Sequence, residues 1–323
     1  MKLLITGGFG NIGLALLDAC SSAGHEVAIF DVRSRRNEKL AKKYAGKVRA
    51  VFFGDIRKKD DVGAAVSGQD VVVHLAAILP PVSETNPSLC RSVNVDGTKN
   101  LTACIAEAGS GRLVLISSVS VMGPTQDKDR VLTTADPPNP TDTYSQSKHQ
   151  AEQLVAASCI DYCILRLAAV MPSRFGSSLH MVKLMFDIPP GARCEIILDI
   201  DAATAIMHAA EKLFHGTSIT KRIFFLGGGR SNGCQLSASE LIGGLFGQIG
   251  LRMPARRYFN NDSNSYYLDW YDTEESEAHL QYQRHSFLDF KAMLNARYGF
   301  LKVPIRLLSP IITRFISAQS PYG

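Results

Sequence analysis

Short apolar runs alternate with segments of helical periodicity between residues 2 and 167, and this alternation limits the fold more than any other feature. The runs are rich in Val, Ile, Leu and Phe, which is typical of strands buried on both faces of a parallel sheet. Because connections between parallel strands are right-handed, we predict an α/β fold with a doubly wound parallel (Rossmann) sheet. The expected strands are 2–5, 26–30, 48–52, 71–75, 113–117 and 162–167, and the expected helices are 12–23, 38–44, 62–66, 93–108 and 145–157.

The alternation stops after Pro172. Strands are expected at 195–198 and 222–226, and helices at 202–214, 238–248 and 287–298. These elements are too few for a second doubly wound domain. We therefore predict a Rossmann domain at 1–170, with returning segments at about 195–226, and a smaller C-terminal α+β cap formed mainly by 171–323.

The composition argues against several classes of protein. The formal net charge of +5 is spread along 323 residues, so we expect no nucleic-acid partner. No apolar run reaches the length of a membrane-spanning helix, and a short strand at residue 2 leaves no room for a secretory leader. The 7 cysteines have no C-x-x-C spacing. We therefore expect a soluble, cytoplasmic protein with buried thiols.

Residues 301–319 form an apolar stretch that also carries Lys302, Arg306 and Arg314. Such a stretch could lie on a membrane surface. Pro304 and Pro310 argue against one long interfacial helix, because proline lacks the backbone N–H and its ring clashes with the preceding turn. We therefore expect packing on the cap or at a subunit interface, and consider a membrane surface the less favoured partner.

Three glycines follow the first strand in TGGFGNIG (6–13), where a helix is expected to begin. Glycine at Gly7, Gly10 and Gly13 would allow a sharp turn, close approach of the backbone to a pyrophosphate, and tight packing of the helix on the sheet. The helix N-terminus would present unpaired N–H groups to the phosphates. A dinucleotide site is therefore predicted. No Gly-Lys-Ser/Thr follows, which argues against a P-loop.

The next expected strand ends at Asp31, 18 residues after Gly13. A carboxylate at this place accepts hydrogen bonds from the adenosine ribose and repels a 2′-phosphate, which favours NAD as the cofactor. Three arginines follow and could hold a 2′-phosphate instead, so NADP stays possible. They are Arg33, Arg35 and Arg36.

Tyr144 and Lys148 stand four residues apart and share one face of an expected helix. Ser118 ends the fifth strand, and strand carboxyl ends line the ligand crevice of a parallel sheet. We expect Ser118 and Tyr144 to converge beside the cofactor. Lys148, together with an oxidised nicotinamide, would lower the pKa of the Tyr144 phenol. Tyr144 would then exchange a proton with a substrate oxygen, Ser118 would hold that oxygen, and the cofactor would carry a hydride.

The chain resembles an extended short-chain dehydrogenase/reductase of the NAD-dependent epimerase/dehydratase superfamily. The resemblance covers about the first 215 residues, through TGGFGNIG (6–13), GDI (54–56), HLAA (74–77), NVDGT (94–98), ISSVSVMG (116–123), YSQSK (144–148), LRLAAV (165–170) and IDAA (200–203). It implies a homodimer built through two helices per subunit. It also implies that Lys148 holds the nicotinamide ribose, that Asn94 braces the strand ends, and that further residues line the cofactor: Asn11, Ile12, Asp55, Ile56, Leu75, Ala76 and Ala77.

Three residues depart from that family, and two of them, Ala169 and Glu195, point away from nucleotide-sugar substrates. Met122 replaces a usual tyrosine, Ala169 replaces an asparagine, and Glu195 stands where an arginine would meet a diphosphate. The pattern is nearer the subgroup that resembles 3β-hydroxysteroid dehydrogenases and ketone reductases. Residues expected to line an apolar pocket, or else to pack in the core, are Leu167, Met122, Met171 and 78–81.

We therefore predict an NAD(P)-dependent oxidoreductase that interconverts a secondary alcohol and a ketone, with the cap binding an apolar or mixed small molecule. The alternatives are a nucleotide-sugar epimerase or dehydratase and a non-catalytic NAD(P)-sensing protein. His180, His279 and His285 show no ligand spacing, so no metal is expected. His74 is assigned a structural role, and Asp201 is expected to cap a helix. The YYLDWY segment (266–271) is either a substrate wall or part of the cap core.

Overall fold

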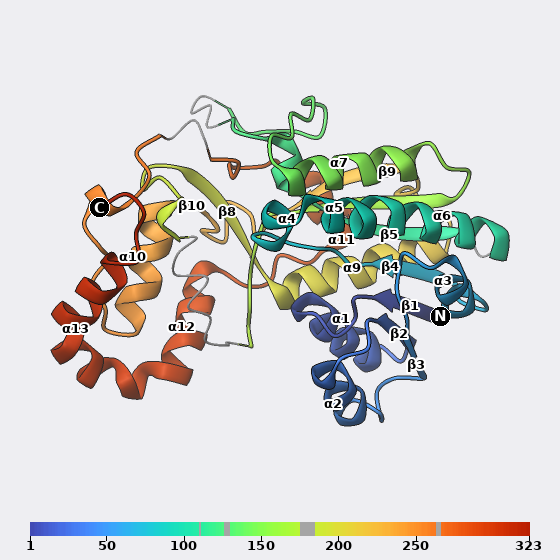
Figure 1. Cartoon of the computed structure of the whole chain (residues 1–323), viewed down its shortest axis with the longest axis horizontal. Helices are drawn as coiled ribbons and strands as arrows, with labels where there is room; N and C mark the ends of the chain where they lie inside the picture. The colour runs from blue at the N-terminus through green and yellow to red at the C-terminus, as the bar shows by residue number, and fades with distance from the viewer. Residues whose placement is uncertain (110, 126–129, 175–184, 263–265) are drawn as a thin grey trace.

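The computed structural model describes residues 1–109, 111–125, 130–174, 185–262 and 266–323, and His180 lies outside these ranges. Seven parallel strands form the main sheet in the order β3-β2-β1-β4-β5-β6-β9 (Figure 1). The predicted doubly wound sheet is confirmed, and its strand order reverses between β1 and β4. The strands are β1 (Lys2–Thr6), β2 (Glu26–Asp31), β3 (Ala50–Phe53), β4 (Val71–His74), β5 (Arg112–Ser118), β6 (Asp161–Leu167) and β9 (Arg222–Leu226).

Helices cover both faces of this sheet, as its uniformly apolar strands require. Along β1, Leu3 and Ile5 pack into the core of one face, whereas Leu4 packs into the core of the other. The first face carries α1 (Asn11–Ser22), α2 (Arg35–Lys43) and α9 (Asp199–Phe214). The second face carries α3 (Lys59–Val66), α6 (Gly97–Ala108) and α7 (Thr143–Ala156).

The segment between β4 and α6 departs from the single helix expected at 93–108. Two short helices, α4 (Val82–Thr85) and α5 (Pro87–Arg91), come first. A π-helical turn, η1 (Ser92–Asp96), then leads into α6. Such turns are rare and often occur at functional sites. A 3-10 turn, η2 (Val119–Met122), directly follows β5.

A second, three-stranded sheet lies beside the main one, in the order β10-β8-β7. It comprises β7 (Ala169–Met171), β8 (Arg193–Leu198) and β10 (Gln235–Ser237). Of the segments expected to return at about 195–226, β9 extends the main sheet and α9 covers it, whereas β8 joins the small sheet. The small sheet shares a core with α10 (Ala238–Gln248) and α12 (Phe287–Tyr298), and α11 (Glu274–Leu280) packs near β9.

The apolar stretch near residue 300 forms one helix, α13 (Lys302–Ser317), after a 3-10 turn, η5 (Gly299–Leu301). The expectation that its prolines would prevent a long helix is wrong. Pro304 lies in the first turn, where the N–H has no intrahelical partner to lose. Pro310 lies inside the helix without ending it. Among the described residues, no helix combines the length and apolar character needed to cross a membrane.

Candidate active site

The glycine turn joins β1 to α1 at the edge where the strand order reverses. Gly7 has a φ of +66°, and a Cβ there would lie 2.8 Å from the Cα and N of Ala76. A Cβ on Gly13 would lie 2.5 Å from the carbonyl oxygen of Gly8. Both positions therefore require glycine, one for the turn and one for helix packing. Gly10 precedes α1, and the N–H groups of Asn11 and Ile12 lie in its first turn, where helical residues have no intrahelical acceptor.

Asp31 lies beside this turn, at the end of β2. One carboxylate oxygen accepts a hydrogen bond from the N–H of Phe9 at 2.9 Å, and the other accepts from the N–H of Val32 at 2.8 Å. Burial raises the pKa of Asp31, and these hydrogen bonds together with Arg36 oppose the rise. The carboxylate therefore braces the glycine turn as well as facing the edge of the sheet.

Of the three arginines after Asp31, only one reaches the glycine turn through a described contact. Arg36 donates from Nη1 to the carbonyl oxygen of Phe9 at 3.0 Å. Arg33 pairs with Glu38 at 2.8 Å and lies over the ring of Phe53. Arg35 is exposed. A 2′-phosphate at this edge would therefore meet Arg36 first.

The remaining residues assigned to the cofactor follow the ends of β3 and β4. Asp55 is held by Arg57 at 2.6 Å, and that hydrogen bond lowers the pKa of its carboxyl. The side chain of Ile56 is 4% exposed and packs beneath Gly97, so only its backbone can reach a ligand. Leu75, Ala76 and Ala77 are half-buried and lie next to Gly7.

Ser118 and Tyr144 converge at the end of β5. The Ser118 hydroxyl lies near enough to the Tyr144 phenol to lower its pKa, although 26 positions separate the two residues in the chain. Ser118 is fixed in turn by Ser120, whose N–H and hydroxyl approach its Oγ at 3.1 and 2.9 Å. The structure therefore brings together the hydroxyl and the phenol that the proposed chemistry needs.

Burial dominates the electrostatics at Tyr144 and Lys148. In the protein alone, burial raises the pKa of the Tyr144 phenol, and the hydrogen bond from Ser118 offsets only part of that rise. Burial also lowers the pKa of Lys148 from 10.5 to about 8, against the attraction of Glu152. The protein alone therefore does not lower the pKa of Tyr144.

Lys148→Met is expected to stabilise the protein at neutral pH while removing its activity. At pH 7 the native state holds a buried ammonium, and methionine removes that cost. The midpoint of thermal unfolding should rise by roughly 2–4 °C. Between pH 8 and 10.5 the unfolded chain binds more protons than the native state at this residue, so the wild type gains stability as pH rises and the difference shrinks. Thermal unfolding at pH 7 and pH 10 checks this, and a midpoint below that of the wild type at pH 7 would contradict it.

The start of α7 is held from two sides. Asp142 and Ser145 form a capping box around the first turn. Glu84 of α4 accepts hydrogen bonds from the N–H groups of Thr143 and Tyr144, each at 3.1 Å. No sequence signal pointed to Glu84, because about 60 positions separate it from its partners.

Asn94 connects the loop after β4 to α7. Its side-chain amide donates to Ser147 at 2.9 Å and exchanges hydrogen bonds with the backbone of Ile78. Ser147 donates to the carbonyl oxygen of Tyr144 at 2.7 Å. The π-helical turn places Asn94 at this junction, which agrees with the bracing role that the resemblance implies.

His74 extends this network toward β1. Its Nδ1 lies 2.7 Å from the hydroxyl of Thr6, and its Nε2 lies 3.1 Å from that of Thr98. Thr98 donates to the carbonyl oxygen of Asn94, so Nε2 carries the hydrogen and Thr6 donates to Nδ1. Burial lowers the pKa of His74 to about 3, which keeps the ring neutral. The residue therefore acts structurally, as the sequence indicated.

Most residues that were expected to line the substrate pocket lie either in the core or on the surface. Met122 and Leu167 are buried in the core, so neither lines a pocket. Met171 is half-buried, and Leu79 is exposed in the loop 78–81. In the YYLDWY segment, Tyr271 is buried, whereas Tyr267 is close enough to Tyr144 to influence its pKa. Tyr267 is therefore a candidate wall of the site.

Glu195 does not face a ligand. It is fully buried, and its carboxylate accepts from the N–H groups of Gly229 and Tyr271, each at 3.0 Å, and from the side chain of Gln235 at 3.1 Å. Burial raises its pKa to about 7. The interpretation of Glu195 as repelling a diphosphate is wrong, because the carboxylate accepts hydrogen bonds from residues in and around the small sheet.

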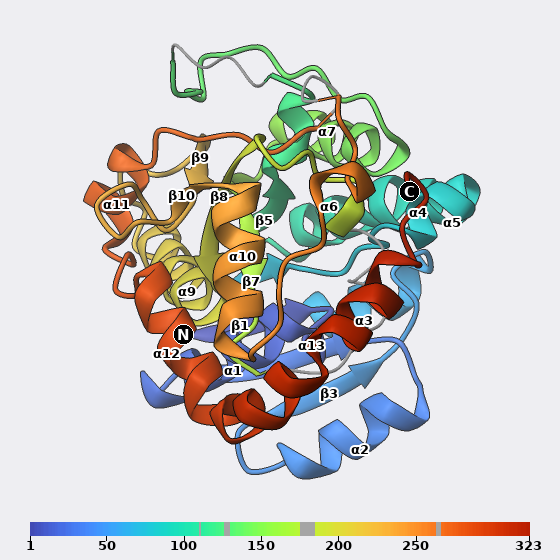
Figure 2. The same cartoon turned by 90° about the vertical axis from the view of Figure 1, so that its left-hand side faces the viewer.

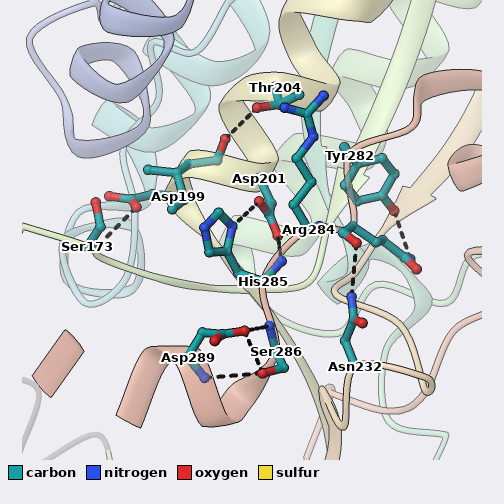
Figure 3. A network of polar contacts seen from close by, with 12 residues as sticks. Ser173, Asp199, Asp201, Thr204, Asn232, Tyr282, Arg284, His285, Ser286 and Asp289 are labelled. Atoms are coloured by element: carbon teal, nitrogen blue, oxygen red, sulfur yellow. Dashed lines mark hydrogen bonds and ion pairs between the residues drawn. The ribbon is translucent and has the colours of Figure 1, made fainter. Parts of the chain in front are cut away.

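The helix-cap interpretation of Asp201 is also wrong. Helix α9 begins at Asp199, and the carboxylate of Asp201 instead accepts from Nδ1 of His285 at 2.6 Å and from the N–H groups of His285 and Arg284 at 2.9 and 3.2 Å (Figure 3). Asp199 accepts from the N–H of Ser173 at 2.9 Å. Asp201 therefore fastens the segment before α12 to the main fold and takes no part in the site.

A family model described as the NAD dependent epimerase/dehydratase family matches residues 3–216. Among curated relatives, a 3-beta-hydroxysteroid dehydrogenase of Mycolicibacterium neoaurum is 35% identical over 164 residues, which are 48% of this chain and 42% of that protein. A decarboxylating sterol-4-alpha-carboxylate 3-dehydrogenase of Saccharomyces cerevisiae is 35% identical over 161 residues, or 48% and 45% of the two chains. The matched segment thus spans less than half the length of these relatives.

Solved structures match over nearly the whole chain. The dTDP-glucose 4,6-dehydratase DesIV of Streptomyces venezuelae aligns with a TM-score of 0.74 at 24% identity, covering 92% of this chain and 96% of that one. The UDP-Glc/GlcNAc 4-epimerase of Campylobacter jejuni aligns with a TM-score of 0.73 at 20% identity, covering 94% and 99%. At this level of identity the similarity is one of fold.

Proposed function

Because this chain belongs to the NAD dependent epimerase/dehydratase family, we propose that it is an NAD-linked oxidoreductase that interconverts a secondary alcohol and a ketone. The proximity of Ser118 and Tyr144, with Lys148 one turn further along α7, carries this proposal. The substrate is an apolar or mixed small molecule, which the curated steroid and sterol dehydrogenases support.

The chain's own residues divide the work at the carboxyl edge of the sheet. The glycine turn and the first N–H groups of α1 would hold the pyrophosphate of NAD, and Asp31 would hold the adenosine ribose. When bound, NAD would accept or supply the hydride. Tyr144 would exchange a proton with the substrate oxygen, and Ser118 would donate a hydrogen bond to that oxygen as its charge develops. Lys148 would hold the nicotinamide ribose.

A screen of hydroxysteroids and 3-ketoacyl compounds, followed by the absorbance of reduced cofactor, tests this function. We expect net reduction of NAD by at least one secondary alcohol, or net oxidation of NADH by the matching ketone. Turnover without any net change in cofactor redox state would contradict it.

A nucleotide-sugar epimerase or dehydratase is the second candidate. The engagement of Glu195 inside the small sheet favours it, because that carboxylate no longer opposes a diphosphate. Ala169 still lacks the hydrogen-bonding side chain usual in those enzymes. Stoichiometric NAD released from denatured protein, with nucleotide-sugar turnover and no net reduction, would favour this candidate.

Asp31→Ser is expected to shift the cofactor preference toward NADP. The change removes hydrogen bonds to the ribose and the repulsion of a 2′-phosphate, and leaves Arg36 at the glycine turn. We expect Kd for NAD to rise by about tenfold or more, while Kd for NADP falls. Titration of both cofactors gives the ratio, and Asp60→Ser on the exposed start of α3 is the matched control. A wild-type protein that binds NADP tenfold more tightly than NAD would refute the assignment.

The quaternary structure and location belong to the same proposal. We infer a homodimer in the cytoplasm, with residues 171–323 forming most of the substrate cap. The family resemblance supports a dimer built through two helices of each subunit. Sedimentation velocity of the purified protein tests the dimer.

A further inference from the structure

Helix α13 exposes a row of large apolar side chains. Val303, Leu307 and Ile311 are 70%, 78% and 70% exposed, and Phe315 continues the same four-residue spacing. Residues four apart lie along one face of a helix. Phe300 precedes the helix and is 77% exposed, and Leu308 flanks the row. We call these six residues the α13 apolar face.

The opposite side of α13 attaches the helix to the protein through two hydroxyl groups and through Ile316, which packs against the core around Phe186 and Phe259. Ser309 is 2% exposed and accepts a hydrogen bond from the N–H of Arg252 at 3.2 Å. Thr313 donates to the carbonyl oxygen of Arg252 at 3.3 Å. An ordinary surface helix buries its apolar side and exposes its polar side. The large side chains of the α13 apolar face are instead exposed, so these residues did not take the cap packing expected from the sequence.

The charged residues of the C-terminal segment that contains this face all have one sign. Between residues 290 and 323 the sequence contains Lys291, Arg297, Lys302, Arg306 and Arg314, and no aspartate or glutamate. Arg306 and Arg314 are exposed beside the α13 apolar face, and Lys302 is half-exposed. In Figure 2 the helix lies at the front of the molecule, so a flat surface could approach it.

We propose that α13 binds this protein to an anionic lipid surface. The α13 apolar face would enter the boundary between headgroups and acyl chains, parallel to the membrane plane, while the flanking cations contact lipid phosphates and carboxylates. This is interfacial attachment, which needs no membrane-spanning helix. It goes beyond the proposed catalysis and does not depend on it.

The charge pattern favours a lipid surface over a second copy of the chain. A two-fold symmetric pairing of α13 would bring the same cations toward one another, since an isologous interface uses one patch twice. The helix carries no acid that could neutralise them. An anionic bilayer supplies that charge.

Sedimentation with phosphatidylcholine vesicles, with and without phosphatidylserine, tests the proposal on the full chain. The wild type should bind vesicles that contain phosphatidylserine, and binding should weaken with salt. Leu307→Ser combined with Ile311→Ser should abolish binding. Replacing Lys302, Arg306 and Arg314 by glutamate should weaken it by roughly a hundredfold or more.

The matched control is Lys39→Glu with Lys42→Glu, which reverses two exposed charges on α2, a helix that Figure 1 shows apart from α13. This variant should bind as the wild type does. Because the substituted α13 side chains are exposed, circular dichroism should show unchanged folding in every variant. Absence of wild-type binding to both vesicle types would overturn the proposal. A dimer that Leu307→Ser and Ile311→Ser dissociate, without vesicle binding, would assign the face to a second copy instead.

Discussion

Tyr144→Phe should lower kcat by roughly 10²–10⁴-fold and leave the affinity for NAD nearly unchanged. In the proposed function the phenol exchanges a proton with the substrate oxygen, and phenylalanine keeps the ring without the hydroxyl. Ser118 would still hydrogen-bond the substrate, so KM should change far less than kcat. Steady-state kinetics on the best substrate, with cofactor titration, separates these effects.

The matched control is Tyr162→Phe, a buried tyrosine near the amino end of β6. It removes a phenol hydroxyl from a strand of the main sheet, at a distance from the proposed catalytic edge, and kcat should stay within about twofold of the wild type. Normal turnover by Tyr144→Phe would exclude Tyr144 as the proton-transfer group. Equal losses in the two variants would indicate a general effect on folding.

Gly7→Ala should abolish NAD binding and destabilise the fold. The left-handed backbone at Gly7 disfavours any other residue, and the new Cβ would lie 2.8 Å from the backbone of Ala76. Relief of that contact must displace either the glycine turn or the strand end that holds Leu75 to Ala77. We expect a loss of roughly 2–4 kcal/mol, combining conformational strain with the steric clash.

Gly24→Ala separates the cost of the strained backbone from the cost of the steric clash. Gly24 has a φ of +77°, and a Cβ at this position would have no heavy atom within 4 Å, so the change costs only the strained backbone, about 1 kcal/mol. The NAD affinity of this variant should match that of the wild type. Chemical denaturation and cofactor titration of both variants check the comparison. Wild-type NAD affinity in Gly7→Ala would show that the turn does not approach the pyrophosphate.

The main sheet could be predicted because its determinants are local. A buried parallel strand reads as a continuous apolar run, and the six expected strands all occur within two residues of their predicted bounds. The convergence of Ser118 and Tyr144 also followed from local signals, since both lie at strand or helix ends that the topology places at one edge.

The features that sequence reasoning missed depend on contacts between distant segments. Glu84 lies about 60 positions from the amides of α7 that it binds. Glu195 was expected to repel a diphosphate, but its carboxylate binds the backbone N–H groups of Gly229 and Tyr271, which come from other segments. Pro310 disfavours a helix locally, yet α13 continues through it. Tertiary hydrogen bonds of Ser309 and Thr313 hold this helix in place.

The hydrogen bonds through Thr6, His74, Thr98, Asn94 and Ser147 join the glycine turn to the backbone of Tyr144. These contacts lie within residues 1–170 and involve no residue of the small sheet or of α10 to α13. Under the proposed function, these hydrogen bonds connect the turn that would hold the cofactor to the residue that would transfer the proton. Insertions or substitutions in the proposed cap would then change which molecule is admitted without altering that connection. Such a separation would allow one reaction geometry to serve many substrates.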